Sequence, residues 1–212
     1  MNKALGYIFL FFAVVVGFNF ALISLQNLFG SHRGHLSPPG LALASEAGDF
    51  GLNSNDIGLF NPGDAAKKIV ITQGYGRTPY SYMYPNGWHD GVDIAAVYGA
   101  PIYAASTGTV FAVGNQDDYC YHRGFGKYVA VEDNVHKVVQ WYAHLGTMDV
   151  NVGQSVAKGV RLGTVGATGL ETGTHLHFSI FDLNGFSMTP RDGCGPEPTG
   201  KDKDPIPFLE NL

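Results

Sequence analysis

Two histidines separated by one residue lie within the strand-like run His175-Leu176-His177-Phe178. Because side chains alternate between the two faces of a strand, both imidazoles point to one face, while Leu176 and Phe178 point into the core. Side chains two residues apart on a strand are about 7 Å apart, so the two rings can serve one site together. One ring can bind a metal ion while its neighbour transfers a proton.

A second candidate group consists of His89 and, four residues later, Asp93. Gly91 between them disfavours a helix, so we expect a tight loop that leads into a strand at residues 92–95. Together with His177, this imidazole and this carboxylate make three ligands for a zinc ion. A zinc ion with three protein ligands keeps an open position for water or substrate, which is typical of catalytic rather than structural sites.

A third candidate is His144, which ends the strand-like run 138–144 and can reach a neighbouring site from the edge of a sheet. Taken alone, each group has an ordinary structural explanation. The chain has eight histidines, so a chance His-x-His pair is not rare, and an isolated histidine is more often a hydrogen-bonded structural residue. We interpret the other four as solvated or structural: His32, His35, His122 and His136.

Five blocks follow one another along the chain: HDGVDIAA (89–96), GAPIYAASTGTVFAVG (99–114), YAHL (142–145), VGQSVAKGVRLGTVGATG (152–169) and THLHF (174–178). In this order they resemble the lysostaphin-type (LytM-type) zinc metalloendopeptidases, whose domain is also called the duplicated hybrid motif. The resemblance covers residues 71–190. The chain departs from the family at Thr174, where a proline is usual before His-x-His, and at Ser179, where an acidic residue is usual. Neither position provides a ligand.

The resemblance implies that His89, Asp93 and His177 bind Zn²⁺ and that His144 and His175 are the catalytic pair. It leaves open which of the pair is the general base. By this analogy the protein is a zinc-dependent endopeptidase that uses a metal-activated water to cleave peptide cross-links or bridges of bacterial peptidoglycan. Glycine bridges, D-Ala to diamino-acid links and stem-peptide bonds all remain open as the bond that is cut.

Two other functions are compatible with such a domain. Some members of the family have lost ligands and act as non-catalytic regulators or activators of other cell-wall hydrolases. The presence of all five site residues favours the enzyme. A peptidase that acts on proteins after release from the cell is a third hypothesis, against which an N-terminal anchor argues.

The elements that position these residues are short β-type runs between glycines, of which the chain has 29. This pattern predicts an all-β domain over residues 67–212, with antiparallel strands in a sandwich-like barrel. After Pro190 the sequence is rich in Gly, Pro, Lys and Asp, and we expect irregular structure there. The expected strands are 69–71, 92–95, 101–105, 108–113, 126–132, 137–144, 159–165 and 174–181.

Residues 4–25 are nearly all apolar, and a helix of that length spans roughly 33 Å, enough for a bilayer core of about 30 Å. We therefore expect a transmembrane helix within residues 1–28, with a cleaved secretory signal as the alternative. Residues 29–66 are rich in Gly, Ser, Pro and Asn and predict a flexible linker. The domain is then expected outside the cytoplasm, in the periplasm or cell-wall space, or secreted if the N-terminus is cleaved.

The net charge and the two cysteines limit the possible partners of the chain. The net charge is -5 without a basic cluster, so nucleic acid is not an expected partner. In an exported protein Cys120 and Cys194 can form a disulfide, and the alternative is two unrelated thiols in surface loops. Neither cysteine has a Cys or His neighbour at zinc-finger spacing, so we do not expect them to bind metal.

Overall fold

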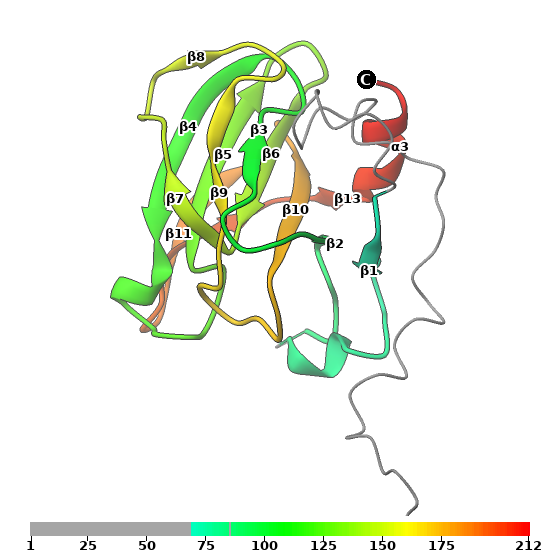
Figure 1. Ribbon diagram of the computed structural model, residues 1–212, viewed down its shortest axis with the longest axis vertical. Helices are drawn as coiled ribbons and strands as arrows, with labels where there is room; N and C mark the ends of the chain where they lie inside the picture. The colour runs from blue at the N-terminus through cyan, green and yellow to red at the C-terminus, as the bar shows by residue number, and fades with distance from the viewer. Residues whose placement is uncertain (1–68, 85) are drawn as a thin grey trace, which may run out of the picture. The chain divides into compact units, whose positions relative to one another are not determined.

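The computed structural model describes residues 69–84 and 86–212. The predicted membrane segment (1–28), the predicted linker (29–66) and the first two residues of the predicted domain lie outside these described residues. Within the described ranges, no helix has the length and apolar character needed to cross a membrane. Antiparallel strands dominate this part of the chain, so the prediction of a mostly β domain is confirmed (Figure 1).

The largest element is an eight-stranded sheet with the hydrogen-bonded order β1-β2-β10-β6-β5-β4-β8, in which β13 also pairs with β10. The described strands at its two ends, β1 and β8, do not pair, so the sheet is open rather than closed into the expected barrel. Its strands are β1 (Ile71–Gln73), β2 (Gly91–Ala95), β4 (Gly108–Asn115), β5 (Lys127–Asp133), β6 (Val138–Ala143), β8 (Ser155–Val156), β10 (His175–Asp182) and β13 (Asp202–Lys203).

Two smaller sheets and three short helices complete the described part. One sheet has the order β3-β9-β7 and the other is the β11-β12 hairpin. Their bounds are β3 (Pro101–Tyr103), β7 (Leu145–Met148), β9 (Arg161–Val165), β11 (Ser187–Arg191) and β12 (Gly195–Thr199), and the helices are the 3₁₀ turns η1 (Ser81–Met83) and η2 (Gln116–Asp118) and the helix α3 (Pro205–Glu210).

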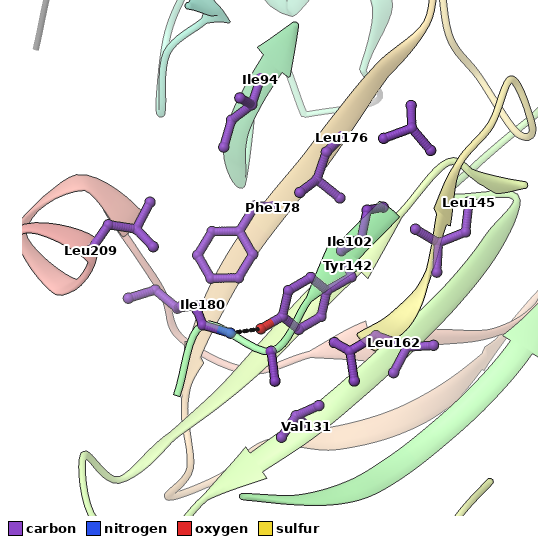
Figure 2. Close-up of a cluster of buried hydrophobic side chains, with 14 of the residues drawn as sticks. Ile94, Ile102, Val131, Tyr142, Leu145, Leu162, Leu176, Phe178, Ile180 and Leu209 are labelled. Carbon is purple, nitrogen blue, oxygen red and sulfur yellow. Dashed lines mark hydrogen bonds between the residues drawn. The ribbon is translucent and has the colours of Figure 1, made fainter. Parts of the chain in front are cut away.

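The main core lies between the eight-stranded sheet and the β3-β9-β7 sheet, which covers one of its faces (Figure 1). Alternation along β10 directs Leu176 and Phe178 into this core, where neither is accessible to solvent. Figure 2 shows them on the same side of β10 as Leu145 and Leu162 of the smaller sheet. Burying side chains of this size stabilises the fold by about 1.5–3 kcal/mol each, so the core holds β10 firmly in place.

The opposite face of β10 carries His175, His177 and Phe181, as strand alternation requires. Near Phe181 this face belongs to a second apolar cluster, which includes Trp141 of β6 and is covered by Met188 of the β11-β12 hairpin. Near His175 and His177 the same face carries the candidate site. The histidines therefore project from a rigid strand whose other face is buried in the main core.

The prediction of irregular structure after Pro190 is wrong. β11 pairs with β12 over five residues, and β13 and α3 follow. Pro190, Pro196 and Pro198 argued against strands, because proline cannot donate a hydrogen bond to a ladder. A two-stranded ribbon has no second neighbour on either side, so it tolerates prolines at positions whose N–H groups would point outward.

A buried carboxylate, Asp133, organises the turn between β5 and β6. It accepts hydrogen bonds from the backbone N–H groups of Val135 (2.8 Å) and His136 (2.9 Å), from Nδ1 of His136 (2.6 Å) and from the hydroxyl of Ser106. Burial would raise the pKa of Asp133, but these hydrogen bonds outweigh it and hold the pKa below its usual range. The folded state therefore strongly prefers the ionised carboxylate.

We expect Asp133→Asn to lower the free energy of unfolding by about 2–3 kcal/mol near pH 7, because four donor groups lose a charged acceptor that is itself buried. The depressed pKa fixes the pH dependence. This stability is fully present above the unfolded-state pKa of about 3.9 and is lost as the pH falls through the folded-state pKa. Urea unfolding of variant and wild type at neutral pH and in acid measures the effect. The difference between their free energies of unfolding must shrink in acid.

The adjacent Glu132 provides the control, because its carboxylate accepts only from the exposed Asn134 side chain (2.7 Å) among the described residues. Glu132→Gln should change the free energy of unfolding by less than about 0.5 kcal/mol. Equal stability of Asp133→Asn and wild type near neutral pH would contradict the role assigned to Asp133.

Candidate metal centre

The structure brings the three predicted ligands to one point, although they come from different parts of the chain. β2 pairs with β10 so that Asp93 lies directly opposite His177, and His89 stands just before β2. One ligand atom from each of the three residues lies within 4.8 Å of the other two. Oδ1 of Asp93 is 3.2 Å from Nε2 of His89 and 3.0 Å from Nδ1 of His177.

In each of the two histidines, the partner of one ring nitrogen shows where the proton is held and therefore which nitrogen can offer a lone pair to a metal ion. Nδ1 of His89 lies 2.7 Å from the carbonyl oxygen of Gly74. A carbonyl can only accept, so this Nδ1 carries the proton and Nε2 faces the cluster with its lone pair. In His177, Nε2 lies 2.7 Å from the hydroxyl of Ser179 and 3.4 Å from the carboxylate of Asp90. A proton on that Nε2 leaves Nδ1 free toward Asp93.

These contacts test whether the residues fit a zinc ion. Two imidazole nitrogens and one carboxylate oxygen converge, and all three side chains are buried. Each histidine has a partner for its second nitrogen, which is the arrangement that orients metal-binding histidines in known sites. The donor set and its surroundings therefore fit zinc.

The electrostatics also favour a cation. Burial alone would raise the pKa of Asp93, but hydrogen bonds from His177 and His89 hold it well below its usual range. Burial would lower the pKa of His177, but the carboxylates of Asp90 and Asp93 outweigh burial and raise it to about 9. The cluster thus attracts positive charge, and a metal ion must displace the proton that His177 otherwise holds.

His144 and His175 lie beside this cluster, with their ring centroids 4.8 Å apart. Nε2 of His175 is 3.5 Å from Oδ1 of Asp93. Nδ1 of His144 lies 2.7 Å from the carbonyl oxygen of Thr168, and Nδ1 of His175 lies 2.7 Å from that of Gly173. Both rings therefore carry a proton on Nδ1, which leaves Nε2 free to accept a proton.

His144 differs from the prediction in its backbone. It stands one residue beyond the end of β6, with φ of +60°. A left-handed residue other than glycine costs energy and persists only where its surroundings fix it. Here the N–H of His144 donates to the carbonyl of Phe125 (3.0 Å), and its own carbonyl accepts from the N–H of Gly166 (2.9 Å). Burial, with His175 and His177 nearby, lowers the pKa of His144 to about 3, so its ring is neutral near pH 7.

A groove of about 260 Å³ opens beside the cluster and reaches Asp93 and His175. Tyr84 in its wall stacks on His89, with ring centroids 5.3 Å apart. The tyrosine hydroxyl donates to the side-chain oxygen of Gln73 (3.3 Å). The groove is lined by Thr72, Gln73, Tyr80, Met83, Tyr84, Asp93, Leu170, Glu171, Thr172, Gly173, Thr174 and His175.

Several supporting residues were not foreseen from the sequence. Ser179 stands two residues after His177, so strand alternation was a signal that places both on one face. Asp90 had no such signal, because it lies in the loop before β2. The roles of the backbone carbonyl groups of Gly74 and Thr168 could not be predicted from residue types, since every residue has a backbone carbonyl.

The close packing of β2 against β10 explains why residue 91 is a glycine. It pairs with Ser179, and a Cβ at Gly91 would lie 2.5 Å from the Ser179 hydroxyl and 2.9 Å from Cε1 of His177. We expect Gly91→Ala to displace the His177 ring and to weaken zinc binding at least about tenfold. Calorimetric titration of the metal-free protein with zinc measures this change.

Gly159→Ala is a suitable control, because its Cβ would meet no described atom within 4 Å although φ is +82°. It should cost about 1 kcal/mol of stability through its left-handed backbone and leave zinc affinity unchanged. The same zinc affinity in Gly91→Ala and wild type would show that the close packing of β2 against His177 does not shape the site.

Comparisons with known proteins agree on one family. The family model described as "Peptidase family M23" matches residues 87–190. Lysostaphin of Staphylococcus simulans is 34% identical over 140 residues, which are 66% of this chain and 25% of lysostaphin. The crystallised catalytic domain of lysostaphin aligns with a TM-score of 0.50 and 31% identity, covering 65% of this chain and 89% of that domain.

Two further relatives carry more specific names. Glycyl-glycine endopeptidase ALE-1 of Staphylococcus capitis is 35% identical over 140 residues, 66% of this chain and 34% of that protein. Peptidoglycan DD-endopeptidase ShyB of Vibrio cholerae is 38% identical over 97 residues, 45% of this chain and 21% of that protein. The matched region thus spans only between 21% and 34% of these curated relatives.

Proposed function

Because the chain belongs to peptidase family M23, we propose that it is a zinc-dependent endopeptidase that cleaves peptide cross-links or bridges of bacterial peptidoglycan. The observation that carries the proposal is the convergence of His89, Asp93 and His177, with His144 and His175 beside them. All five side chains are in place and no observation favours a non-catalytic regulator, so the enzyme is the better interpretation.

We assign the zinc ion to Nε2 of His89, Oδ1 of Asp93 and Nδ1 of His177. When bound, zinc supplies Lewis acidity, which polarises a carbonyl oxygen and makes a water molecule acidic enough to attack near neutral pH. Ser179 and Asp90 hold the ring of His177 through its Nε2, and the carbonyl of Gly74 holds that of His89. The buried cluster keeps these rings from rotating.

His144 and His175 move protons. Each ring holds its own proton on Nδ1 against a backbone carbonyl, so Nε2 can accept a proton from an attacking water. Once protonated at Nε2, either ring can donate a hydrogen bond to the developing oxyanion of the peptide and a proton to the leaving amine. Two neighbouring rings allow these two tasks to be divided.

We propose a peptide of peptidoglycan as the substrate, lying in the groove that reaches Asp93 and His175. The names of the relatives point to two kinds of bond, one within a glycyl-glycine bridge and one in a DD cross-link. Asp93 and His175 line the groove, so a peptide in it can present its carbonyl carbon to the cluster.

We also propose that the domain, residues 67–212, works outside the cytoplasm, in the periplasm or cell-wall space. The disulfide between Cys120 and Cys194 supports this location, because disulfides form and persist in oxidising compartments. In this proposal, residues 1–28 anchor the chain in the membrane and residues 29–66 are the linker between the anchor and the domain.

Digestion of purified peptidoglycan, followed by mass analysis of the products, tests the function. Two preparations of peptidoglycan are digested, one that contains glycine bridges and one that contains direct cross-links. We expect new amino termini in one of them, with fragment masses that identify the bond, and no such products after chelation. Unchanged mass profiles for both preparations would contradict the proposal.

A further inference from the structure

The segment from the end of β4 to the start of β5, residues 115–126, contacts the site directly through Phe125, whose ring centroid lies 5.5 Å from that of His177. It begins with η2 and runs alongside residues 168–170, which include the Thr168 carbonyl that holds the ring of His144. The close approach is visible at Gly169, where a Cβ would collide with the backbone of Gly124 and Gly126. The two segments therefore behave as one packed unit.

Asp117 makes the main polar contact between these segments. Its carboxylate accepts from the backbone N–H of Gly169 at 3.1 Å (Oδ2) and 3.2 Å (Oδ1), and from the N–H of His122 at 3.0 Å. On the same side, the N–H of Leu170 donates to the carbonyl of Gly124 (2.7 Å). A charged acceptor thus fixes the residue that directly follows Thr168.

His144 depends on both segments. Its N–H donates to the carbonyl of Phe125 (3.0 Å) and its Nδ1 donates to the carbonyl of Thr168 (2.7 Å). With φ of +60°, the backbone of His144 cannot hold this position unaided. A shift of residues 168–170 would therefore rotate or release the imidazole.

The disulfide attaches residues 115–126 to the β11-β12 hairpin. Cys120 in the segment is bonded to Cys194, which directly precedes β12, and both are buried. Gln116, which is 1% exposed, strengthens the attachment. Its Nε2 donates to the carbonyl of Pro196 (2.8 Å), and its Oε1 accepts from the N–H of Phe125 (2.7 Å).

We propose that Asp117 is a positioning residue for His144, and that the Cys120–Cys194 disulfide holds the segment that carries Asp117. The inference rests on the proposed function, because it concerns the turnover to which His144 contributes. Asp117 is neither a ligand of the proposed metal nor part of the groove wall. Its loss should therefore lower kcat and leave the zinc content unchanged.

Kinetics of full-length variants provide the first test. Asp117→Ala should lower kcat on peptidoglycan about 10-fold to 100-fold, as expected for a misplaced catalytic group, with the same zinc content as wild type. Asp118→Ala is the matched control, since the neighbouring carboxylate accepts only from the side chain of Asn115 (2.7 Å) within the described ranges. Wild-type kcat in Asp117→Ala, or an equal loss in Asp118→Ala, would overturn the proposal.

Nuclear magnetic resonance of the zinc-loaded protein with ¹⁵N-labelled histidine provides the second test. The Nδ1–H signal of His144, assigned by its absence from His144→Ala, should be lost or broadened in Asp117→Ala and retained in Asp118→Ala. An unchanged signal in Asp117→Ala would overturn the proposal even if kcat fell, because Asp117 would then act by another route.

If Asp117→Ala does not fold, the double variant Cys120→Ser/Cys194→Ser replaces it, with the same expected losses of kcat and of the His144 signal, and wild-type values would overturn the proposal. If the wild-type protein binds zinc but leaves peptidoglycan intact, this result refutes the proposed function and does not refute the positioning role of Asp117. The signal of His144 in the two aspartate variants then still decides whether Asp117 positions that ring.

Discussion

Asp93→Ala is expected to abolish tight zinc binding and to lower kcat/KM by about 1000-fold or more, because Lewis-acid stabilisation worth several kcal/mol is lost with the metal. Asp93 supplies the one carboxylate of the described ligand cluster and touches both imidazoles, at 3.2 Å from His89 and 3.0 Å from His177. Without it, only the two imidazole ligands remain, and the site loses the carboxylate that contacts both rings.

Zinc per protein molecule after dialysis, together with the release of amino termini from peptidoglycan, measures both effects. Asp149→Ala is the control, because this carboxylate pairs with Arg161 on the surface (2.8 Å) and should alter neither quantity. Retention of one zinc ion and of full activity by Asp93→Ala would refute the ligand assignment.

His175→Ala is expected to keep its zinc and to lower kcat by about 100-fold to 10,000-fold, the usual contribution of a general acid or base. His175 stands outside the three-residue ligand cluster, with Nε2 3.5 Å from Oδ1 of Asp93 and its Nδ1 proton held by the carbonyl of Gly173. Its removal should therefore separate metal binding from turnover, which Asp93→Ala cannot do.

The control for this variant is His136→Gln, a half-exposed histidine on the turn between β5 and β6 that contacts Asp133. It should retain both zinc and kcat. Loss of zinc from His175→Ala would make His175 a ligand, and an unchanged kcat would remove it from the catalytic pair. Either result would contradict the division of roles between His175 and His177.

Strand patterning predicted much of the architecture around the site. The expected strand over residues 174–181 corresponds to β10 within one residue at each end. The prediction followed from physics, because Leu176 and Phe178 must enter a core and the intervening histidines must then face the other way. A separate argument, that Gly91 disfavours a helix, predicted a strand over residues 92–95, and β2 begins one residue earlier, at Gly91.

The features that the sequence did not reveal depend on contacts between distant backbone segments. The left-handed turn at His144 is fixed by Phe125 and Gly166, and no local residue pattern marks it. The role of Asp117 has no signal in the local sequence, because its partner is the N–H of Gly169, 52 residues away. Pairing of β11 with β12 was hidden by prolines that a ribbon tolerates.

Zinc dependence of peptidoglycan cleavage is tested most directly by titrating the chelated, full-length protein with zinc while new amino termini are counted. We predict no cleavage by the chelated protein, a rise in proportion to added zinc, and a plateau at one equivalent. Full cleavage by the chelated protein, or none at one equivalent of bound zinc, would contradict the assignment of a catalytic zinc site to His89, Asp93 and His177.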